Sequence, residues 1–326
     1  GFIEYNPYYK VENLKEKIIN DYNLFKYESR WKTFVQIIIK ILFLKNNDIL
    51  LIGGYGHFEC WITLLLGNLK GIRMVGWLGA SSKSTVNNTF FHKFLKKFFI
   101  SKLSSIVTYG KLSTQFYKNL GYPKEKIFTG INSSDTSFFK FLVNDNLIIE
   151  TGKRVKCVWA GKFIPRKGLI ELLNEIIPDK DILSNIDLKI TGFGPLELDI
   201  VNKIKPYENI SFVGKSDEFV LREIFQEGAI FLHSTWADPF SRILSEASSA
   251  GLFIISSIYD DSTEVLTEGI NLVKYNPSNP GSFKKAFLKA LQICKENSLT
   301  KKNLSDISPF SSRKYSEKIF QAITNF

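Results

Sequence analysis

A turn with two lysines follows an apolar segment near the middle of the chain. Residues 161–168 read GKFIPRKG and come directly after the apolar run 155–160. Gly161 at a strand end lets a ligand approach the backbone, and Lys162 and Lys167 bracket the turn before a helical pattern begins. Two cations beside a helix N-terminus suit a diphosphate group. Lysines near turns are also often simply solvated, which is the alternative interpretation.

A second segment, residues 234–251, carries two carboxylates in the sequence STWADPFSRILSEASSAG. Pro239 suits the entry to a helix, which places Asp238 in a loop and Glu246 about two turns into the helix. The first backbone N–H groups of that helix point toward any anion in the loop. Two such carboxylates can each bind hydroxyl groups, one on a sugar and one on a ribose. The alternative is that Glu246 is a surface residue of the helix.

Glycines also follow an apolar run in the N-terminal half, where residues 48–52 precede the sequence GGYGHFE. Ligands bind at the carboxyl edge of parallel sheets, so Gly54, Tyr55 and His57 are candidates for an acceptor site; a turn or capping role is the alternative.

The sequence shows no typical metal-binding pattern, because no His has a second His or a Cys at ligand spacing. The D-x-D pair that starts at Asp179 falls in a loop. We interpret this pair as a solvated turn and expect no metal.

One predicted helix, residues 90–103, alternates aromatic and basic pairs in the sequence FFHKFLKKFFISKL. Helical spacing gives it an aromatic face and a basic face that carries Lys93, Lys96 and Lys97. Such a helix can lie at a membrane interface, with its rings at the lipid boundary and its lysines on anionic headgroups. The alternative is a core-facing helix with a solvated basic back.

The net charge of +11, from 43 Lys and Arg against 32 Asp and Glu, lies mainly in the first half. Residues 1–150 hold 20 basic and 11 acidic side chains, net +9, whereas residues 151–326 hold 23 and 21, net +2. Residues 60–124 have ten Lys or Arg and no carboxylate. A basic field in one half indicates a polyanionic partner, either nucleic acid or anionic lipid. Compositional bias is the alternative.

The composition excludes several classes of protein. With 44% hydrophobic and 14% aromatic residues, the chain is too apolar to be disordered. The apolar segment 34–44 is too short for a membrane helix, which needs about 20 residues, and the first ten residues lack the order of a signal peptide. Three widely spaced cysteines do not suggest a disulfide framework. We therefore expect a cytoplasmic protein, peripheral on the inner membrane face.

Short apolar runs alternate with helical patterns, which predicts an α/β fold with doubly wound parallel sheets. We expect strands at residues 2–5, 24–27, 48–52, 72–77, 105–109, 155–160, 186–191, 210–213, 229–233 and 252–256. Ten strands suit two Rossmann-like domains, with the seam in the polar stretch 135–153. We expect an N-terminal domain over 1–150, a C-terminal domain over 151–305, and a C-terminal helix over 306–326 that packs back toward the N-terminal domain.

The motifs GKFIPRKG, ITGFGP and ISFVG and the spacing of Asp238 and Glu246 resemble those of the retaining GT-B glycosyltransferases of family four. That family shows G-R-L-x-x-x-K-G and E-P-F-G-x-x-x-x-E-A in the same order, and the resemblance covers residues 105–326 well. It implies two Rossmann-like domains that face each other across a cleft, the donor on the C-terminal one and the acceptor on the N-terminal one. It also implies a metal-independent, retaining hexosyltransferase that uses a UDP- or GDP-sugar and a glycan or lipid-linked acceptor. Surface polysaccharide, lipopolysaccharide or capsule would be its product.

The resemblance further implies roles for single residues. Lys162 and Lys167 would neutralise the donor diphosphate as it leaves, Glu246 would bind the ribose hydroxyls and Asp238 would hold the transferred sugar. The other donor-binding residues that it implies lie in the turns near the base and at the helix N-terminus: Gly161, Gly192, Gly194, Lys215, Phe240, Ser241 and Arg242.

The sequence departs from the family pattern at three places. Asp238 replaces Glu, Lys162 replaces Arg, which removes bidentate geometry but not charge, and Ser241 with Arg242 replaces Gly and an apolar residue. An unusual donor or reduced activity would follow.

The alternatives to a glycosyltransferase are a non-catalytic or nucleic-acid-binding protein on the same scaffold, or a GT-B epimerase of nucleotide sugars. We expect no nucleic-acid partner, because the sequence shows no base-reading helix or stacking motif.

Overall fold

The computed structural model describes residues 30–45, 47–82, 89–132, 134–140, 149–150 and 152–324. The strands expected at 2–5 and 24–27 lie outside these residues. The chain forms two compact units, one of residues 1–131 together with 313–326 and one of residues 132–312.

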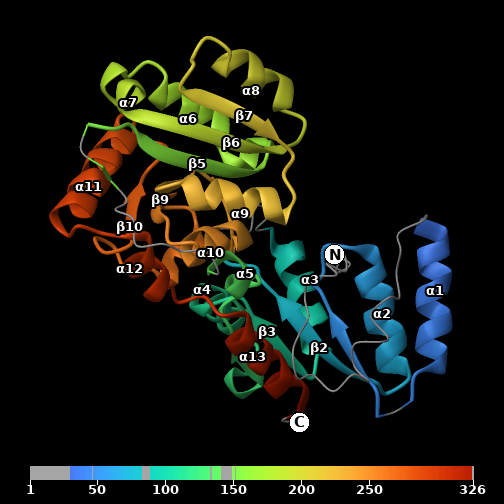
Figure 1. The fold of residues 1–326 in the computed structure, drawn as a ribbon. Helices are drawn as coiled ribbons and strands as arrows, with labels where there is room; N and C mark the ends of the chain where they lie inside the picture. Colours follow the sequence, from blue (N-terminus) through green and yellow to red (C-terminus); the bar gives the residue numbers. More distant parts are fainter. Residues whose placement is uncertain are drawn as a thin grey trace. The chain divides into compact units, whose positions relative to one another are not determined.

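The first unit is built on a four-stranded parallel sheet in the order β1-β2-β3-β4 (Figure 1). Its strands are β1 (Ile49–Ile52), β2 (Arg73–Leu78), β3 (Ser105–Thr108) and β4 (Ile127–Thr129). Its helices are α1 (Arg30–Phe43), α2 (Phe58–Leu69), α3 (Phe90–Ser101), α4 (Lys111–Asn119), the 3-10 helix η1 (Lys124–Lys126) and α13 (Ser312–Thr324). A helix lies between each pair of successive strands, which is the connection that parallel neighbours require.

Helix α13 packs on this sheet although it comes from the other end of the chain. The indole N–H of Trp77 donates to the hydroxyl of Tyr315, and the hydroxyl of Ser105 donates to the carbonyl of Ala322 at 2.8 Å. Val75, in the central strand β2, is fully buried in the small core that α13 completes. The first unit therefore draws on both halves of the sequence.

The second unit contains a six-stranded parallel sheet in the order β10-β9-β8-β5-β6-β7. Its strands are β5 (Val155–Lys162), β6 (Ile186–Phe193), β7 (Ile210–Gly214), β8 (Ile230–His233), β9 (Phe253–Ser257) and β10 (Leu272–Tyr275). Its helices are α5 (Thr136–Lys140), η2 (Pro165–Lys167), α6 (Leu169–Ile176), α7 (Lys180–Asn185), α8 (Glu197–Ile204), α9 (Glu218–Glu227), α10 (Arg242–Ser249), η3 (Asp261–Val265), α11 (Ser282–Glu296) and α12 (Lys301–Asp306). The strand order reverses between β5 and β8, and ligands bind outside the carboxyl ends of strands at such a point.

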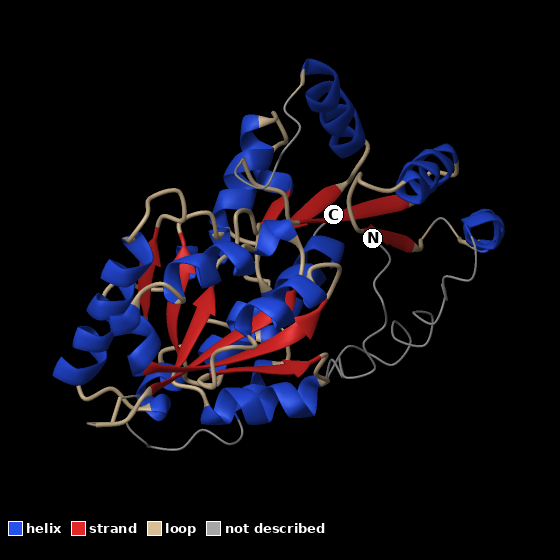
Figure 2. Cartoon of the chain, turned by 90° about the horizontal axis from the view of Figure 1, so that it is seen from above, coloured by secondary structure: helices blue, strands red, loops and turns tan. Residues whose placement is uncertain are grey.

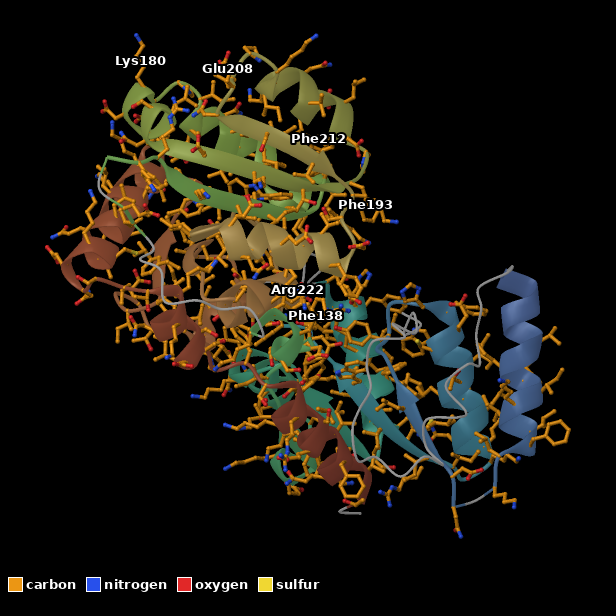
Figure 3. All side chains as sticks on the ribbon, viewed as in Figure 1. Phe138, Lys180, Phe193, Glu208, Phe212 and Arg222 are labelled. Atoms are coloured by element: carbon orange, nitrogen blue, oxygen red, sulfur yellow. The ribbon has the colours of Figure 1, made fainter. Side chains whose placement is uncertain are left out.

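Helices cover both faces of the six-stranded sheet, as Figure 2 shows (helices blue, strands red). Trp159 of β5 and Phe287 of α11 belong to the larger core, which includes α6 and α8. On the other face Phe231 of β8 meets the ring of Phe225 of α9 edge-on, with centroids 5.8 Å apart. Helix α5 is held on α9, where the guanidinium of Arg222 lies 4.4 Å from the ring centre of Phe138 (Figure 3).

The α/β fold with parallel sheets is confirmed, and the differences from the expected elements are local. Strands β4 and β10 were not expected, because each is short and lies between polar residues. Strands β5 and β6 run two residues further than expected, which pairs Gly161 with Gly192 and Lys162 with Phe193. Among the described residues, no helix is long and apolar enough to cross a bilayer.

Candidate functional site

The turn after β5 and the loop after β8 lie together where the strand order of the second unit reverses. The amide of Trp236 donates to the carbonyl of Arg166 at 2.8 Å, and the hydroxyl of Ser234 donates to the carbonyl of Lys167 at 2.8 Å. Gly168 has φ +65°, and a Cβ on it would lie 2.2 Å from the carbonyl oxygen of Ser234. Glycine is therefore needed at position 168 for the two segments to approach.

This contact brings together two of the residues that the sequence singled out. The ammonium of Lys167 forms an ion pair with the carboxylate of Asp238, and their side chains are only 13% and 9% exposed. Lys162 does not take part: it is exposed at the end of β5, beside Phe193 in the register of the sheet. The two lysines of the turn thus have different surroundings, one paired inside the protein and one open to solvent.

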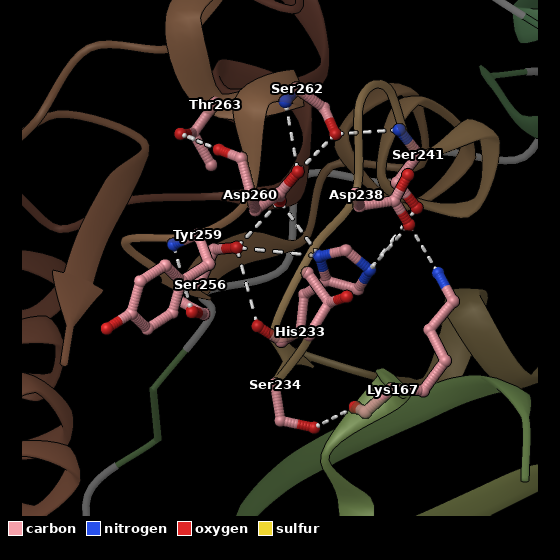
Figure 4. Close-up of polar contacts among 12 residues, drawn as sticks. Lys167, His233, Ser234, Asp238, Ser241, Ser256, Tyr259, Asp260, Ser262 and Thr263 are labelled. Carbon is pink, nitrogen blue, oxygen red and sulfur yellow. Dashed lines mark hydrogen bonds and ion pairs between the residues drawn. The ribbon is translucent and has the colours of Figure 1, made fainter. Parts of the chain in front are cut away.

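His233, at the end of β8, extends the same cluster and was missed by the sequence analysis. Its Nδ1 lies 2.8 Å from a carboxylate oxygen of Asp260, and its Nε2 lies 3.3 Å from the hydroxyl of Ser241 and 4.0 Å from Asp238 (Figure 4). The hydroxyl of Ser256 also donates to Asp260, at 2.7 Å. A lone histidine followed 27 residues later by an aspartate gave no recognisable spacing, because their contact depends on β9 pairing with β8.

Glu246 lies on α10 and is 8% exposed, which excludes the alternative of a surface residue. Burial raises its pKa to about 7, against the opposing effects of the positive charge of Arg242 and a hydrogen bond from Ser134. The neighbouring Ser245 also contacts Ser134, with 3.3 Å between the two hydroxyl oxygens. A carboxyl held in this way gains from a ligand that donates hydrogen bonds to its ionised form.

The backbone N–H group just before α10 already has a hydrogen-bond partner within the protein. The amide of Ser241 donates to the hydroxyl of Ser262 at 2.7 Å, so this N–H does not point freely at a ligand as the resemblance implied. Phe240 is 6% exposed and packs edge-on against Phe310. Arg242 is the first residue of the helix.

The glycines after β6 are required by close packing of the backbone. Gly192 and Gly194 have φ +150° and +152°, and a Cβ on Gly192 would lie 1.9 Å from the carbonyl oxygen of Gly161. The turn that they form carries Phe193, which is 44% exposed, and the ammonium of Lys215 lies 5.1 Å from the centre of this ring. An exposed aromatic ring and a lysine thus border the carboxyl edge of β6 and β7.

In the first unit, a cavity of about 220 Å³ lies at the carboxyl ends of β1 and β2. Gly54 and Tyr55 line it, together with three further aromatic residues: Trp77, Tyr109 and Tyr117. His57 is exposed just before α2 and is not among the lining residues.

The expectation for α3 is wrong in one respect. Lys96 is 7% exposed and its ammonium lies over the rings of Tyr55 and Phe116, so it cannot face a membrane. It shares the buried face of the helix with Phe99 and Ile100, because residues three and four apart lie on one side. Lys93 and Lys97 are exposed, together with four aromatic side chains: Phe90, Phe91, Phe94 and Phe98.

The described residues contain no group of three His, Cys, Asp or Glu side chains that could hold a metal ion. Asp179 caps α7 by accepting from the amides of Asp181 and Ile182, and both aspartates pair with Lys284. The D-x-D pair therefore caps a helix and pairs with Lys284, while the side chain of Asp181 remains 79% exposed to solvent.

Known proteins resemble this chain in sequence and in fold. A family profile described as Glycosyl transferases group 1 matches residues 154–292. The GPI3 subunit of phosphatidylinositol N-acetylglucosaminyltransferase from Saccharomyces cerevisiae is 27% identical over 158 residues, 47% of this chain and 34% of the relative. A subunit of the Arabidopsis thaliana enzyme of that name is 25% identical over 177 residues, 53% of this chain and 38% of the relative. The chain thus matches little more than a third of the length of these relatives.

Solved structures share the fold across most of the chain. Anabaena HepE in complex with UDP and glucose has a TM-score of 0.70 at 12% identity and covers 95% of this chain and 89% of its own. An E. coli structure described as trehalose-6-phosphate bound with UDP-2-fluoro glucose has a TM-score of 0.72 at 12% identity and covers 91% of this chain and 78% of its own. Residues 154–292 thus match the Glycosyl transferases group 1 profile, and most of the chain shares the GT-B fold of these solved structures.

Proposed function

We propose that the protein transfers a sugar, with retention of configuration, from a nucleotide-diphosphate sugar to a glycan or lipid-linked acceptor. The observation that carries this proposal is the buried ion pair of Lys167 and Asp238 at the switch point of the second unit, followed along the chain by the buried Glu246 of α10. Lys167, with Lys162 on the open side, would bind the diphosphate, Asp238 the sugar and Glu246 the ribose. Cations and backbone dipoles can stabilise a leaving diphosphate.

A UDP-sugar is the donor that we propose. Related folds are described with UDP, UDP-glucose or UDP-2-fluoro glucose, and the sequence relatives are named as N-acetylglucosaminyltransferase subunits. UDP-N-acetylglucosamine is therefore the first donor to test. In a retaining front-face reaction, the leaving phosphate oxygen accepts the acceptor proton, so no side-chain base has to be placed opposite the donor.

We further propose that the acceptor is presented at an anionic membrane on the cytoplasmic side, as part of surface glycan synthesis. Helix α3 exposes Phe90 and Phe94 beside Lys93 and Lys97, the combination that suits a lipid interface. Lys102 adds a third cation, with its ammonium 5.6 Å from the ring centre of Phe98. The aromatic lining of the cavity beside β1 and β2 suits stacking against sugar rings of an acceptor.

Donor binding is tested by thermal shift with UDP, GDP, UDP-N-acetylglucosamine, UDP-glucose and GDP-mannose. A ligand at 100 times its Kd stabilises the folded state by about 2.7 kcal/mol, so the donor nucleotide should raise the Tm clearly. Transfer is then followed with labelled donor and a lipid extract. Lys167→Met and Glu246→Gln should abolish it, whereas the matched surface variants Lys189→Met and Glu171→Gln should not. Full transfer by the first two variants would refute the proposal.

Analysis of the reaction products and measurements of lipid binding distinguish the proposed transferase from the alternative functions. NMR of the transferred anomer reports retention or inversion, and donor turnover without any acceptor would indicate an epimerase.

Sedimentation with neutral and anionic vesicles over a salt series tests docking on a membrane. The double variant Lys93→Gln/Lys97→Gln should lose binding to anionic vesicles, while Lys118→Gln/Lys124→Gln, which removes the same charge elsewhere in the unit, should keep it. Retention of duplex nucleic acid with no lipid binding would favour a nucleic-acid-binding protein.

A further inference from the structure

Four side chains of alternating charge type form a buried row in the second unit: Asp260, His233, Asp238 and Lys167 (Figure 4). Their exposed fractions rise along the row, from 0% and 3% to 9% and 13%. The row therefore begins at the fully buried Asp260 and ends nearer the surface at Lys167, whose ammonium we propose binds the donor diphosphate. The ammonium of Lys167 is therefore the most exposed group of the row and the one that a ligand can reach most directly.

The inner end of the row fixes the imidazole. Asp260 accepts hydrogen bonds from the hydroxyl of Ser256 and from the amide and hydroxyl of Ser262. Burial alone raises the pKa of Asp260, but the charge and hydrogen bond of His233 and these hydroxyl donors keep that pKa below its ordinary value. An ionised Asp260 can only accept, so Nδ1 of His233 must carry its proton.

The other nitrogen of the ring faces the outer half of the row. Nε2 of His233 lies 3.3 Å from the hydroxyl of Ser241 and 4.0 Å from a carboxylate oxygen of Asp238. When Nε2 is neutral it accepts from Ser241, and when it is protonated it becomes a donor and a cation beside Asp238. The charged groups next to the ring are Asp260, from the segment after β9, and Asp238, from the loop after β8. Around Asp238 itself, Lys167 of η2 pairs with its carboxylate, the guanidinium of Arg166 donates to the carbonyl of Ala237, and the amide of Asp261 donates to the carbonyl of Asp238.

We propose that His233 is a positioning residue. It neutralises the charge of Asp238 when the donor diphosphate competes with Asp238 for the ammonium of Lys167. This inference rests on the proposed function. The ammonium of Lys167 compensates Asp238 in the structure, so a second cation at His233 gains little from it. Once two phosphate charges share that ammonium, Asp238 attracts a proton from solvent onto Nε2 of His233. The protonated ring, anchored by Asp260, then holds Asp238 ionised and oriented toward the hydroxyls of the sugar.

The row can be tested directly by ¹⁵N NMR titration of the imidazoles of the full chain, which has three histidines. Lys167→Met removes a nearby cation and should raise the titration midpoint of His233 by about one pH unit. Asp238→Asn removes the anion and should lower it by a similar amount. The exposed His57 and His92 lie in the first unit and serve as internal references. A His233 midpoint that neither variant moves would overturn the proposal.

The same spectra with UDP-N-acetylglucosamine test the coupling to the donor. The diphosphate of this molecule does not titrate near neutral pH, so a rise in the His233 midpoint on binding reports proton uptake by the protein and not by the ligand. Saturation of the protein with no change in that midpoint would also overturn the proposal. Failure of this nucleotide sugar to bind contradicts the donor that we propose, and the Lys167→Met and Asp238→Asn titrations then decide the role of His233 on their own.

Discussion

Lys167 and Asp238, 71 residues apart in the chain, form an ion pair whose side chains are almost fully buried at the switch point of the six-stranded sheet. Each residue comes from a segment that follows a different strand, β5 and β8, which are neighbours in the sheet. The pair therefore joins the two halves of the strand order at the edge where a ligand binds in this type of fold. Its removal should affect both stability and donor turnover.

We expect Lys167→Met to lower the free energy of unfolding by about 3–5 kcal/mol, because it leaves the buried carboxylate of Asp238 without its cation. Lys167→Met combined with Asp238→Asn should recover most of that loss but no transfer activity. Urea unfolding of the two single variants and the double variant gives the coupling energy. The exposed pair Lys189–Glu227 is a matched control, for which the coupling should stay below about 1 kcal/mol. Equal coupling in the two cycles would contradict a buried pair.

Glu246 should make stability fall as pH rises. Burial raises its pKa to about 7 from an ordinary 4.5, so its contribution is complete below pH 4.5, where it is protonated in both states. The contribution is lost between pH 4.5 and 7, because the unfolded chain releases the proton more readily. The difference amounts to about 3 kcal/mol.

Urea unfolding at pH 5 and pH 8 measures this effect as the difference between wild type and Glu246→Gln. The glutamine variant should lose less stability over this interval than the wild type. Glu171→Gln, an exposed glutamate on α6, should behave like the wild type. Parallel pH profiles of wild type and Glu246→Gln would show that Glu246 is not held in its protonated form.

A third prediction concerns Lys301, whose ammonium is buried at the end of α9 and donates to the carbonyls of Phe225, Gln226 and Gly228. These are the carbonyls that a helix leaves without partners at its C-terminus. Lys301→Met should therefore destabilise the second unit by about 3 kcal/mol, measured by urea unfolding. The neighbouring Lys302 is exposed, and Lys302→Met should change little. A small effect at both positions would mean that water satisfies the α9 carbonyls.

The sequence predicted the elements well where local pattern decides them. The apolar run that ends at Gly161 forms β5, and the Pro239-to-Gly251 segment contains α10, because strand and helix periodicity are set by residues near in sequence. Lys96 shows the limit of that argument. Helical spacing grouped it with Lys93 and Lys97, but the side of α3 that is buried depends on packing against Tyr55 and Phe116, which periodicity does not encode.

The sequence singled out Lys167 and Asp238, which the structure pairs, but not the residues that pack against them. Lys167 and Asp238 were recognised because they belong to motifs of fixed spacing. His233 and Asp260 were not, since they meet only after β9 has paired with β8 and turned back. Ser134, which donates to Glu246, lies more than a hundred residues away in the sequence. Support of this kind depends on tertiary packing and leaves no local signal.

The last prediction concerns the close contact between the turn after β5 and the loop after β8 at Gly168. Gly168→Ala places a Cβ 2.2 Å from the carbonyl oxygen of Ser234 in a backbone with φ +65°, whereas Gly269→Ala has φ +82° and no neighbour within 4 Å of the Cβ. Both variants carry the cost of a left-handed conformation, about 1 kcal/mol, so their difference in urea unfolding measures the steric conflict alone. We expect Gly168→Ala to be less stable by a further 1–3 kcal/mol or so, and to bind nucleotide more weakly because Lys167 and the loop that carries Asp238 separate. Equal stability and equal nucleotide affinity of the two variants would show that the turn after β5 can move without disturbing the site.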